Sequence, residues 1–210
     1  SGKANNLTAG DDTNNPQLLS NVINNYSAIE FNGTTDNFTA NDSDTLDMKL
    51  TGLSIFKIIN TKTFAGGNFS ILNKGESYAF GSDLENGYKF SNTSDSTTSS
   101  SFVGTTQIYQ LVGMITDKDN TTGTGGLFVD GTLSAGVTFG TGDNNANDLF
   151  IGKAGSNFFA GDIAEIVIIK GECNQENRQL VEGYLANKYA TSDLLPSDHP
   201  YRNYAPIVQS

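Results

Sequence analysis

The side chains best suited to chemistry in this sequence are two acids inside an apolar segment. Asp162 and Glu165 lie in the run GDIAEIVIIKG, residues 161–171, where most other side chains are apolar. In a regular strand, two residues three positions apart point to opposite faces. Glycoside hydrolysis needs two carboxylates about 5–10 Å apart across the scissile bond, and no other predicted strand carries acids at even spacing. The sequence therefore predicts no catalytic carboxylate pair.

Nucleophilic catalysis is not expected either. The sole histidine, His199, stands beside Pro200 in the C-terminal tail, which disfavours a Ser-His-Asp triad. The single cysteine, Cys173, excludes an internal disulfide and any cysteine-based zinc site. We expect this thiol to pack at a strand-to-helix corner, as free cysteines usually do. We predict that the protein is not an enzyme.

Loops rich in oxygen ligands raise the alternative of a bound cation. Calcium takes several oxygen ligands from carboxylates, amides and carbonyls of flexible loops. Three loops have such a composition, namely Asn32–Asp36, Asp117–Asn120 and Asp143–Asp148. Each of them can also be a plain turn, because Asn and Asp are common turn residues.

Sugar binding is the other chemistry that the residues allow. Sugar sites usually combine an aromatic ring with a few well-placed polar groups. Because the sequence has no Trp, the candidates are four Tyr and Phe rings near predicted loops: Tyr78, Tyr88, Phe158 and Phe159. Most large apolar side chains are found in protein cores, so each ring also has that interpretation.

Composition sets the fold class and excludes several partners. Only 17% of the 210 residues are charged and 23 are Gly, which is typical of many short strands joined by polar loops. The net charge of -11 argues against nucleic acid as a partner, because phosphate binding needs clustered cations. No apolar run approaches the roughly 20 residues that span a bilayer, so no membrane insertion is expected.

The elements that must position these residues follow from periodicity. Residues 1–25 are polar and are expected to form an irregular lead-in to a domain over 26–190, with an extended tail over 191–210. Asp130-Gly131 predicts a tight hairpin within 126–140, because this dipeptide supplies the positive φ angles of such turns.

The last predicted strand and the helix after it are the clearest elements. Alternation places Glu165 on one face with Ile163, Val167 and Ile169, and Ala164, Ile166 and Ile168 on the other. A strand that is apolar on both faces is typical of the middle of a sheet. A helix is predicted over 174–190, with Asn174 as its N-cap. Its apolar stripe is Leu180, Val181, Tyr184, Leu185 and Tyr189. The destabilising effect of Gly183 on the helix should be compensated by close contact with the sheet.

Several of these segments resemble a known family. AIEFNGTTDNF, GLFVDGTL, LFIGKAGSNFFAGDIAEIVI and EGYLANKYATSDLLPSDHPY are similar to segments of laminin G-like, concanavalin A-like jelly-roll domains of bacterial and phage proteins. The resemblance covers roughly residues 26–201. It implies an all-β fold: a two-sheet antiparallel jelly-roll sandwich with one C-terminal helix packed on it. It also implies a module of secreted or surface proteins that often binds glycans and often holds a structural Ca²⁺.

The resemblance implies a place for the metal as well. The family sandwich brings its first and last strands together, which points to Asp36 with Asp162 or Glu165 as calcium ligands. A nearby cation would explain an acid on an apolar strand. The alternative is that Glu165 is satisfied by backbone amides, a lysine or water.

Two functions therefore stay open at the level of sequence. The first is a non-catalytic carbohydrate-binding or adhesive module, a lectin-like or adhesin-like domain whose partner is a glycan or polysaccharide. The second is a structural virion or surface-layer protein, such as a phage tail or capsid decoration, that self-associates or packs on a virion scaffold. Both predict an extracellular, cell-surface or virion location.

Overall fold

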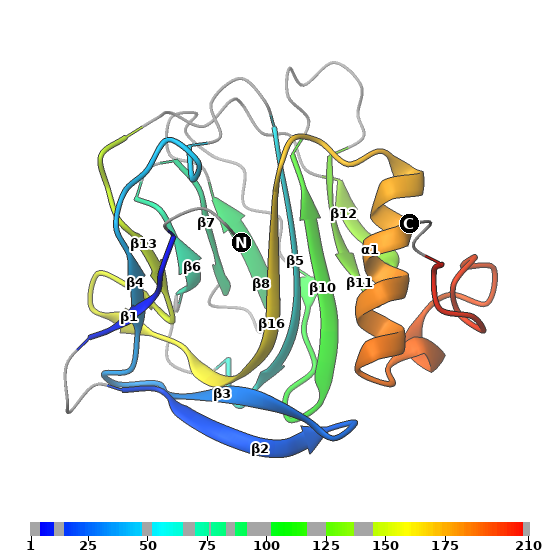
Figure 1. The fold of residues 1–210 in the computed structure, drawn as a ribbon, viewed down its shortest axis with the longest axis horizontal. Coiled ribbons are helices and arrows are strands. Elements are labelled where there is room, and N and C mark those ends of the chain that lie inside the picture. The colour runs from blue at the N-terminus through cyan, green and yellow to red at the C-terminus, as the bar shows by residue number, and fades with distance from the viewer. Residues whose placement is uncertain are drawn as a thin grey trace.

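Two large antiparallel sheets packed face to face form the body of the protein, as the computed structural model shows (Figure 1). The structure describes residues 5–10, 15–47, 52–64, 70–75, 77–82, 87–91, 102–116, 125–136 and 145–207. The predicted two-sheet sandwich with a C-terminal helix is confirmed. The Ser/Thr-rich stretch 92–101 and the loop 117–120 lie outside the described residues.

Sheet A has seven strands in the spatial order β1, β4, β13, β6, β7, β8, β9. These strands are Thr8–Ala9, Phe38–Ala40, Leu149–Ile151, Ser70–Asn73, Ala79–Ser82, Gly87–Ser91 and Phe102–Val103. Sheet B has seven strands in the order β12, β11, β10, β5, β16, β3, β2. These are Thr132–Gly136, Gly126–Val129, Tyr109–Ile115, Leu53–Thr61, Ala160–Lys170, Tyr26–Asn32 and Gln17–Ile23. A small hairpin of β14 (Lys153–Ala154) and β15 (Asn157–Phe158) stands apart.

The predicted hairpin turn is confirmed and the lead-in is more ordered than predicted. Asp130 and Gly131 have φ angles of 48° and 78°, as a tight turn between β11 and β12 requires. Gln17–Ile23, expected to be irregular, instead forms the edge strand β2, in which Leu18 pairs with Ile29 of β3. Pairing with β3 satisfies backbone groups that a polar lead-in would leave to water.

A bulge in β16 changes the predicted faces of that strand. The register against β5 shifts between Ile163 and Glu165, so that Ala164 is the extra residue. Ile163 packs with Ile166 and Ile168 in the core between the sheets, whereas Ala164 packs on the helix side. The prediction that Glu165 shares a face with Ile163 is therefore wrong, because a bulge inverts the alternation beyond it.

The same bulge overturns the argument about the two acids of β16. Asp162 pairs in register with Asn60 just before the bulge, and Glu165 contacts the helix just after it. Both side chains therefore lie on the outer face of sheet B rather than on opposite faces. Their separation by three residues no longer excludes cooperation between them.

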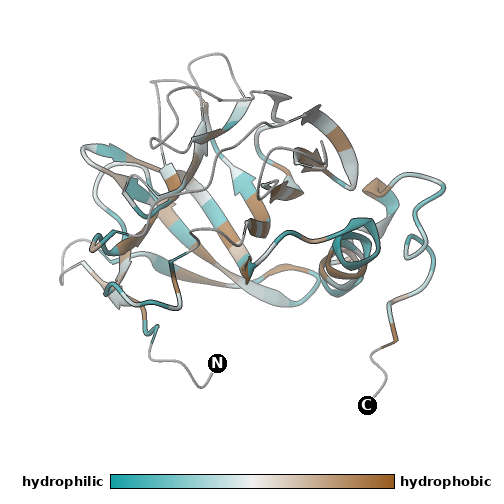
Figure 2. Cartoon of the chain, turned by 90° about the horizontal axis from the view of Figure 1, so that it is seen from above, coloured by the Kyte–Doolittle hydropathy of each residue, from teal (hydrophilic) through white to brown (hydrophobic). Residues whose placement is uncertain are grey.

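The helix α1, Gln175–Lys188, packs on the outer face of sheet B, on the apolar side chains Phe56, Ile58 and Leu111 (Figure 1). The Asn174 side chain accepts a hydrogen bond from Asn177 N at 2.8 Å, which confirms the predicted N-cap. Cys173 is buried in the same cluster, as predicted. Figure 2 looks along α1 and shows that it carries both hydrophilic and hydrophobic residues.

The close packing of α1 differs from the prediction at Gly183. A Cβ on Gly183 would overlap Tyr201 of the C-terminal tail. The missing side chain therefore allows close packing of the tail on the helix, and not of the sheet. Glu182 is fully buried and accepts hydrogen bonds from Arg178, while His199 lies 3.2 Å away. The short 3-10 helix η1, Ser192–Leu194, leads into this tail. The tail is therefore docked on the helix from Leu195 to Tyr201.

Candidate ligand-binding groove

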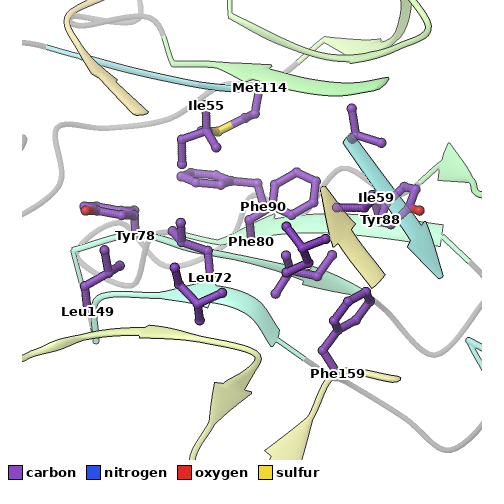
Figure 3. Packing of buried hydrophobic residues seen from close by; sticks show 14 of the residues in the cluster. Ile55, Ile59, Leu72, Tyr78, Phe80, Tyr88, Phe90, Met114, Leu149 and Phe159 are labelled. Carbon is purple, nitrogen blue, oxygen red and sulfur yellow. The ribbon is translucent and has the colours of Figure 1, made fainter. Parts of the chain in front are cut away.

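Three of the four aromatic rings predicted to bind sugar lie in the core. Tyr78, Tyr88 and Phe159 are at most 1% exposed and pack between the two sheets (Figure 3). The Tyr78 hydroxyl donates to the carbonyl of Leu46, and the Tyr88 hydroxyl lies 2.9 Å from that of Thr61. The prediction of a sugar platform at these positions is corrected by their burial, because a surface ligand cannot reach them.

Phe158 differs from the other three rings in that it is only half-buried. It belongs to β15, where the Lys153 ammonium lies 5.6 Å from the centre of its ring. The same ammonium lies 5.8 Å from the ring of Phe150 in β13. This arrangement is a cation–π contact of the kind found on many protein surfaces.

The three predicted calcium ligands are bonded within the protein. The Asp36 carboxylate accepts hydrogen bonds of 2.9 Å from the backbone and from the side-chain amide of Asn32, which closes the turn between β3 and β4. Asp162 accepts a hydrogen bond of 3.0 Å from Asn60 and lies 3.7 Å from the Lys62 ammonium. Burial, and then the charge of Asp162, raise the pKa of Tyr109 above its usual value.

No group of three or more His, Cys, Asp or Glu side chains within the described ranges is placed to hold a metal ion. Asp36 belongs to a separate turn, and Asp162 and Glu165 make different ion pairs. Calcium binding by Asp36, Asp162 and Glu165 therefore stays a prediction.

Glu165 is held by three residues of α1 and its C-cap. Its carboxylate lies 2.8 Å from the Lys188 ammonium and accepts a hydrogen bond of 3.0 Å from the Tyr189 hydroxyl. The Tyr184 hydroxyl lies 3.4 Å from the same carboxylate. The alternative that a lysine satisfies this acid is therefore what the structure contains. The contacts fix the C-terminal end of the helix to β16.

Exposed aromatic rings stand around this ion pair. Tyr26, at the start of β3, and Tyr184, on α1, are 45% and 44% exposed. The Tyr26 ring packs edge-on against Tyr189 at a centroid distance of 5.4 Å. The Lys188 ammonium lies within 5.2–5.4 Å of the rings of Tyr26, Tyr184 and Tyr189. We call Tyr26, Glu165, Tyr184, Lys188 and Tyr189 the tyrosine cluster.

The tyrosine cluster borders a groove between α1, β16 and the C-terminal tail. The groove has a volume of about 850 Å³. Its wall combines Tyr26, Tyr184, Asn187 and Lys188 with the apolar side chains Val167, Leu180, Val181 and Ile207. A concave, mostly apolar surface with a few converging polar groups is the usual form of a ligand site. Here the tyrosine rings supply flat apolar faces, and Asn187 and Lys188, the latter paired with Glu165, supply polar groups.

The surroundings shift the pKa values of two groups in the cluster, Tyr189 and Lys188. Burial and the neighbouring Glu165 carboxylate raise the pKa of Tyr189 to about 12, so its hydroxyl is a donor. Burial lowers the pKa of Lys188, but its hydrogen bonds to Glu165 and Tyr184 outweigh this effect and raise the pKa overall. The cluster therefore offers a carboxylate, an ammonium group and tyrosine hydroxyls at once.

Only one member of this cluster, Glu165, is among the site residues that the sequence predicts. The predicted apolar stripe of the helix includes Tyr184, but this side chain is 44% exposed, whereas Leu185 of the same stripe and Ala186 face inward. The spacing of four between Tyr184 and Lys188 is the signal that could have shown a shared helix face. The local sequence does not show that Tyr26 lies beside these two residues. The pairing of β3 within the sheet brings it there.

Known proteins resemble the chain in structure and not in sequence. No protein-family model matches it, and no curated protein is significantly similar to it. The binding domain of Paraclostridial Mosquitocidal Protein 1 has a TM-score of 0.66 at 11% identity, over 87% of this chain and 48% of that one. Botulinum neurotoxin type C, which depends on interaction with two ganglioside molecules to enter cells, has a TM-score of 0.62 at 13% identity, over 86% and 46%. Trypanosoma rangeli sialidase in complex with sialic acid has a TM-score of 0.56 at 11% identity, over 87% and 30%.

These similarities establish the fold and no more. They place the chain among β-sandwich domains, which include parts of both enzymes and binding proteins. The chain spans under half the length of the two toxin chains and under a third of the sialidase. The laminin G-like family is not confirmed, because no family model matches.

Proposed function

We propose that the protein is a non-catalytic carbohydrate-binding module, and that its glycan lies in the groove beside α1. The observation that carries this proposal is the pair of exposed rings, Tyr26 and Tyr184, which lie 5.3 and 5.4 Å from the Lys188 ammonium of the Glu165–Lys188 ion pair. Aromatic faces bury the apolar face of a ring-shaped ligand. The carboxylate and the ammonium group match hydroxyl groups that donate and accept hydrogen bonds.

Two further considerations support a glycan over other ligands. Structurally similar domains include one whose protein depends on gangliosides, although a shared fold does not by itself define function. The net charge of -11 disfavours nucleic acid.

Among the described residues, no helix has the length and the apolar character to cross a bilayer. We extend the proposal to a location on a cell surface, on a virion or outside the cell, where glycans are found.

The proposal is tested on a glycan array that includes neutral oligosaccharides and ganglioside head groups. We expect the wild-type protein to bind at least one glycan, and Tyr26→Ala and Tyr184→Ala each to weaken that binding at least about tenfold, the effect of losing roughly 1.4 kcal/mol. Tyr184→Phe distinguishes the contribution of the ring to glycan binding from that of its hydroxyl, because Phe retains the ring alone.

Leu133→Ala serves as the matched control. Leu133 is also large, apolar and exposed, at 57%, but it lies on β12, at the opposite edge of sheet B from β2. Its removal should leave glycan binding unchanged. Wild-type protein that binds no glycan on the array would refute the proposed function. Binding that survives the loss of both Tyr26 and Tyr184 would refute the proposed site.

A further inference from the structure

A second opening in the molecule lies between the two sheets, away from the groove. It has a volume of about 560 Å³, within the range of roughly 300–1,000 Å³ typical of ligand pockets. Its lining side chains come from β16 and β3 on one side and from β4 and β13 on the other. Sheet A contributes Phe38 and Leu149, and sheet B contributes Ile29, Ile166 and Ile168. We call this opening the inter-sheet cavity.

The cavity exists because two neighbouring strands separate. β3 pairs with β16 only from Ala160 to Ile163, which is the part before the bulge. Beyond the bulge, the described part of sheet B pairs β16 with β5 alone. Figure 1 shows β3 running away from the upper half of β16. The inner face of β16 is therefore open at this edge.

Large apolar side chains are left incompletely covered there. Ile29, Phe38, Ile166 and Ile168 are only partly buried, although they pack on the core. Each Å² of apolar surface removed from water is worth about 25 cal/mol, so a ligand that fills the cavity gains from these four side chains. Apolar cavities of sufficient size bind small apolar molecules rather than ordered water.

One cation stands at the end of the cavity. Lys170 lines it and follows Ile166 and Ile168 at alternate positions of β16. In the part of the chain that the structure describes, its ammonium donates to the carbonyl of Asp44 at 3.4 Å and pairs with no carboxylate. Glu165, the other charged lining residue, is already paired with Lys188. Because no described carboxylate neutralises Lys170, its ammonium can pair with an anionic group at this position.

We propose that the inter-sheet cavity binds an anionic amphiphile of the fatty-acid type. The acyl chain lies along the inner face of β16, over Ile166 and Ile168, and the carboxylate pairs with Lys170. A sugar fits this cavity less well than an acyl chain, because most of the lining side chains are apolar and offer no hydrogen-bond partners to hydroxyl groups. The glycan groove has a different set of lining residues, although Glu165 of the tyrosine cluster also borders the cavity.

Decanoate and 1-decanol, which differ in charge but share the chain, are the probes. Isothermal titration with the wild-type chain should show binding of both, with decanoate the tighter ligand. Lys170→Glu should weaken decanoate about tenfold or more and leave 1-decanol unchanged, since a loss near 1.4 kcal/mol is typical of a lost charged hydrogen bond. Lys89→Glu, on β8 of sheet A and not at the cavity, is the matched control for charge.

A substitution that fills the inter-sheet cavity tests where the acyl chain of the probe binds. Ile166→Trp should abolish binding of both probes, while Ile108→Trp, at an exposed isoleucine outside the cavity, should not. Methyl NMR of the wild type avoids the question of folding: decanoate should shift the methyl signals of Ile166 and Ile168 but not those of Ile58, which faces the helix. Wild-type protein that binds neither probe, or shifts that leave Ile166 and Ile168 unaffected, would overturn the proposal. An equal effect of Lys170→Glu on both probes would overturn the role of Lys170.

Discussion

The carboxylate of Glu165 lies 2.8 Å from the ammonium of Lys188, so an ion pair joins the longest strand of sheet B to the last turn of α1. Both side chains are about one-quarter exposed, at 22% and 25%. The contact is thus shielded enough to stabilise the fold and open enough to meet a ligand. The ion pair with Lys188 explains why the apolar strand β16 contains Glu165.

Glu165→Gln should destabilise the protein by about 1–2 kcal/mol, because a partly buried charged hydrogen bond is lost. The melting temperature should fall by roughly 2–8 °C, at 2–4 °C per kcal/mol for a chain of this size. Lys188→Met should cause a similar loss, and the double variant should lose less than the sum.

The same variants separate the ion pair from the predicted calcium site. If the ion pair holds Glu165, wild-type protein should melt at the same temperature in millimolar Ca²⁺ and in EDTA. A calcium-dependent shift that disappears in Glu165→Gln would instead establish the metal site.

Lys57 should be a destabilising residue at neutral pH. Its side chain is fully buried between the sheets, and its amino group lies 2.6 Å from the centre of the Phe80 ring. Among the residues that the structure describes, this group has no hydrogen-bond partner. Burial lowers the pKa of Lys57 well below its usual value of 10.5. Lys57→Met should therefore stabilise the protein by about 1–3 kcal/mol at pH 7, measured by urea unfolding.

The pH dependence has a defined sign. Between the lowered pKa of folded Lys57 and 10.5, the unfolded chain binds the proton that the folded chain has lost. Stability should therefore rise with pH across this window. Lys57→Met should flatten the rise, whereas Lys89→Met, on a partly exposed lysine, should not. An unchanged slope in Lys57→Met would contradict burial of a neutral amine.

Lys74 should stabilise the protein by holding together the loops at one end of sheet A. Its ammonium is fully buried and lies 2.6 Å from Asp42, 3.3 Å from Asp47 and 2.8 Å from the carbonyl of Asn147. Lys74→Met would leave two carboxylates facing each other, at a cost of about 2–4 kcal/mol. The melting temperature should fall by roughly 5–15 °C. Adding Asp47→Asn should recover part of the loss, and equal melting of both variants would show that Asp47 is uncoupled.

Gly183→Ala should destabilise the protein, against the usual trend. Replacing a glycine inside a helix with alanine normally stabilises by about 1 kcal/mol. Here the new Cβ would overlap the side chain of Tyr201 and displace the C-terminal tail. Adding Tyr201→Gly should restore the normal gain from alanine. Limited proteolysis of residues 196–207 provides the second measurement, because release of the tail should expose them.

The sequence by itself determined the fold class and the local elements. Strand-rich composition, the Asp130-Gly131 turn and the N-cap Asn174 depend on interactions between residues close in the chain, and all three agree with the structure. Local propensity and periodicity are properties of short segments, which explains why they could be predicted.

Tertiary structure decided the site. Whether a ring is core or surface depends on which strands oppose it, so Tyr78, Tyr88 and Phe159 are buried whereas Tyr184 is exposed. The bulge at Ala164 set which face Glu165 occupies, because it arises from the register between β16 and β5. Tyr26 reaches Tyr189 only through the packing of α1 on sheet B. Contacts between residues far apart in the chain are fixed by the whole set of packed side chains, and periodicity within one segment cannot specify them.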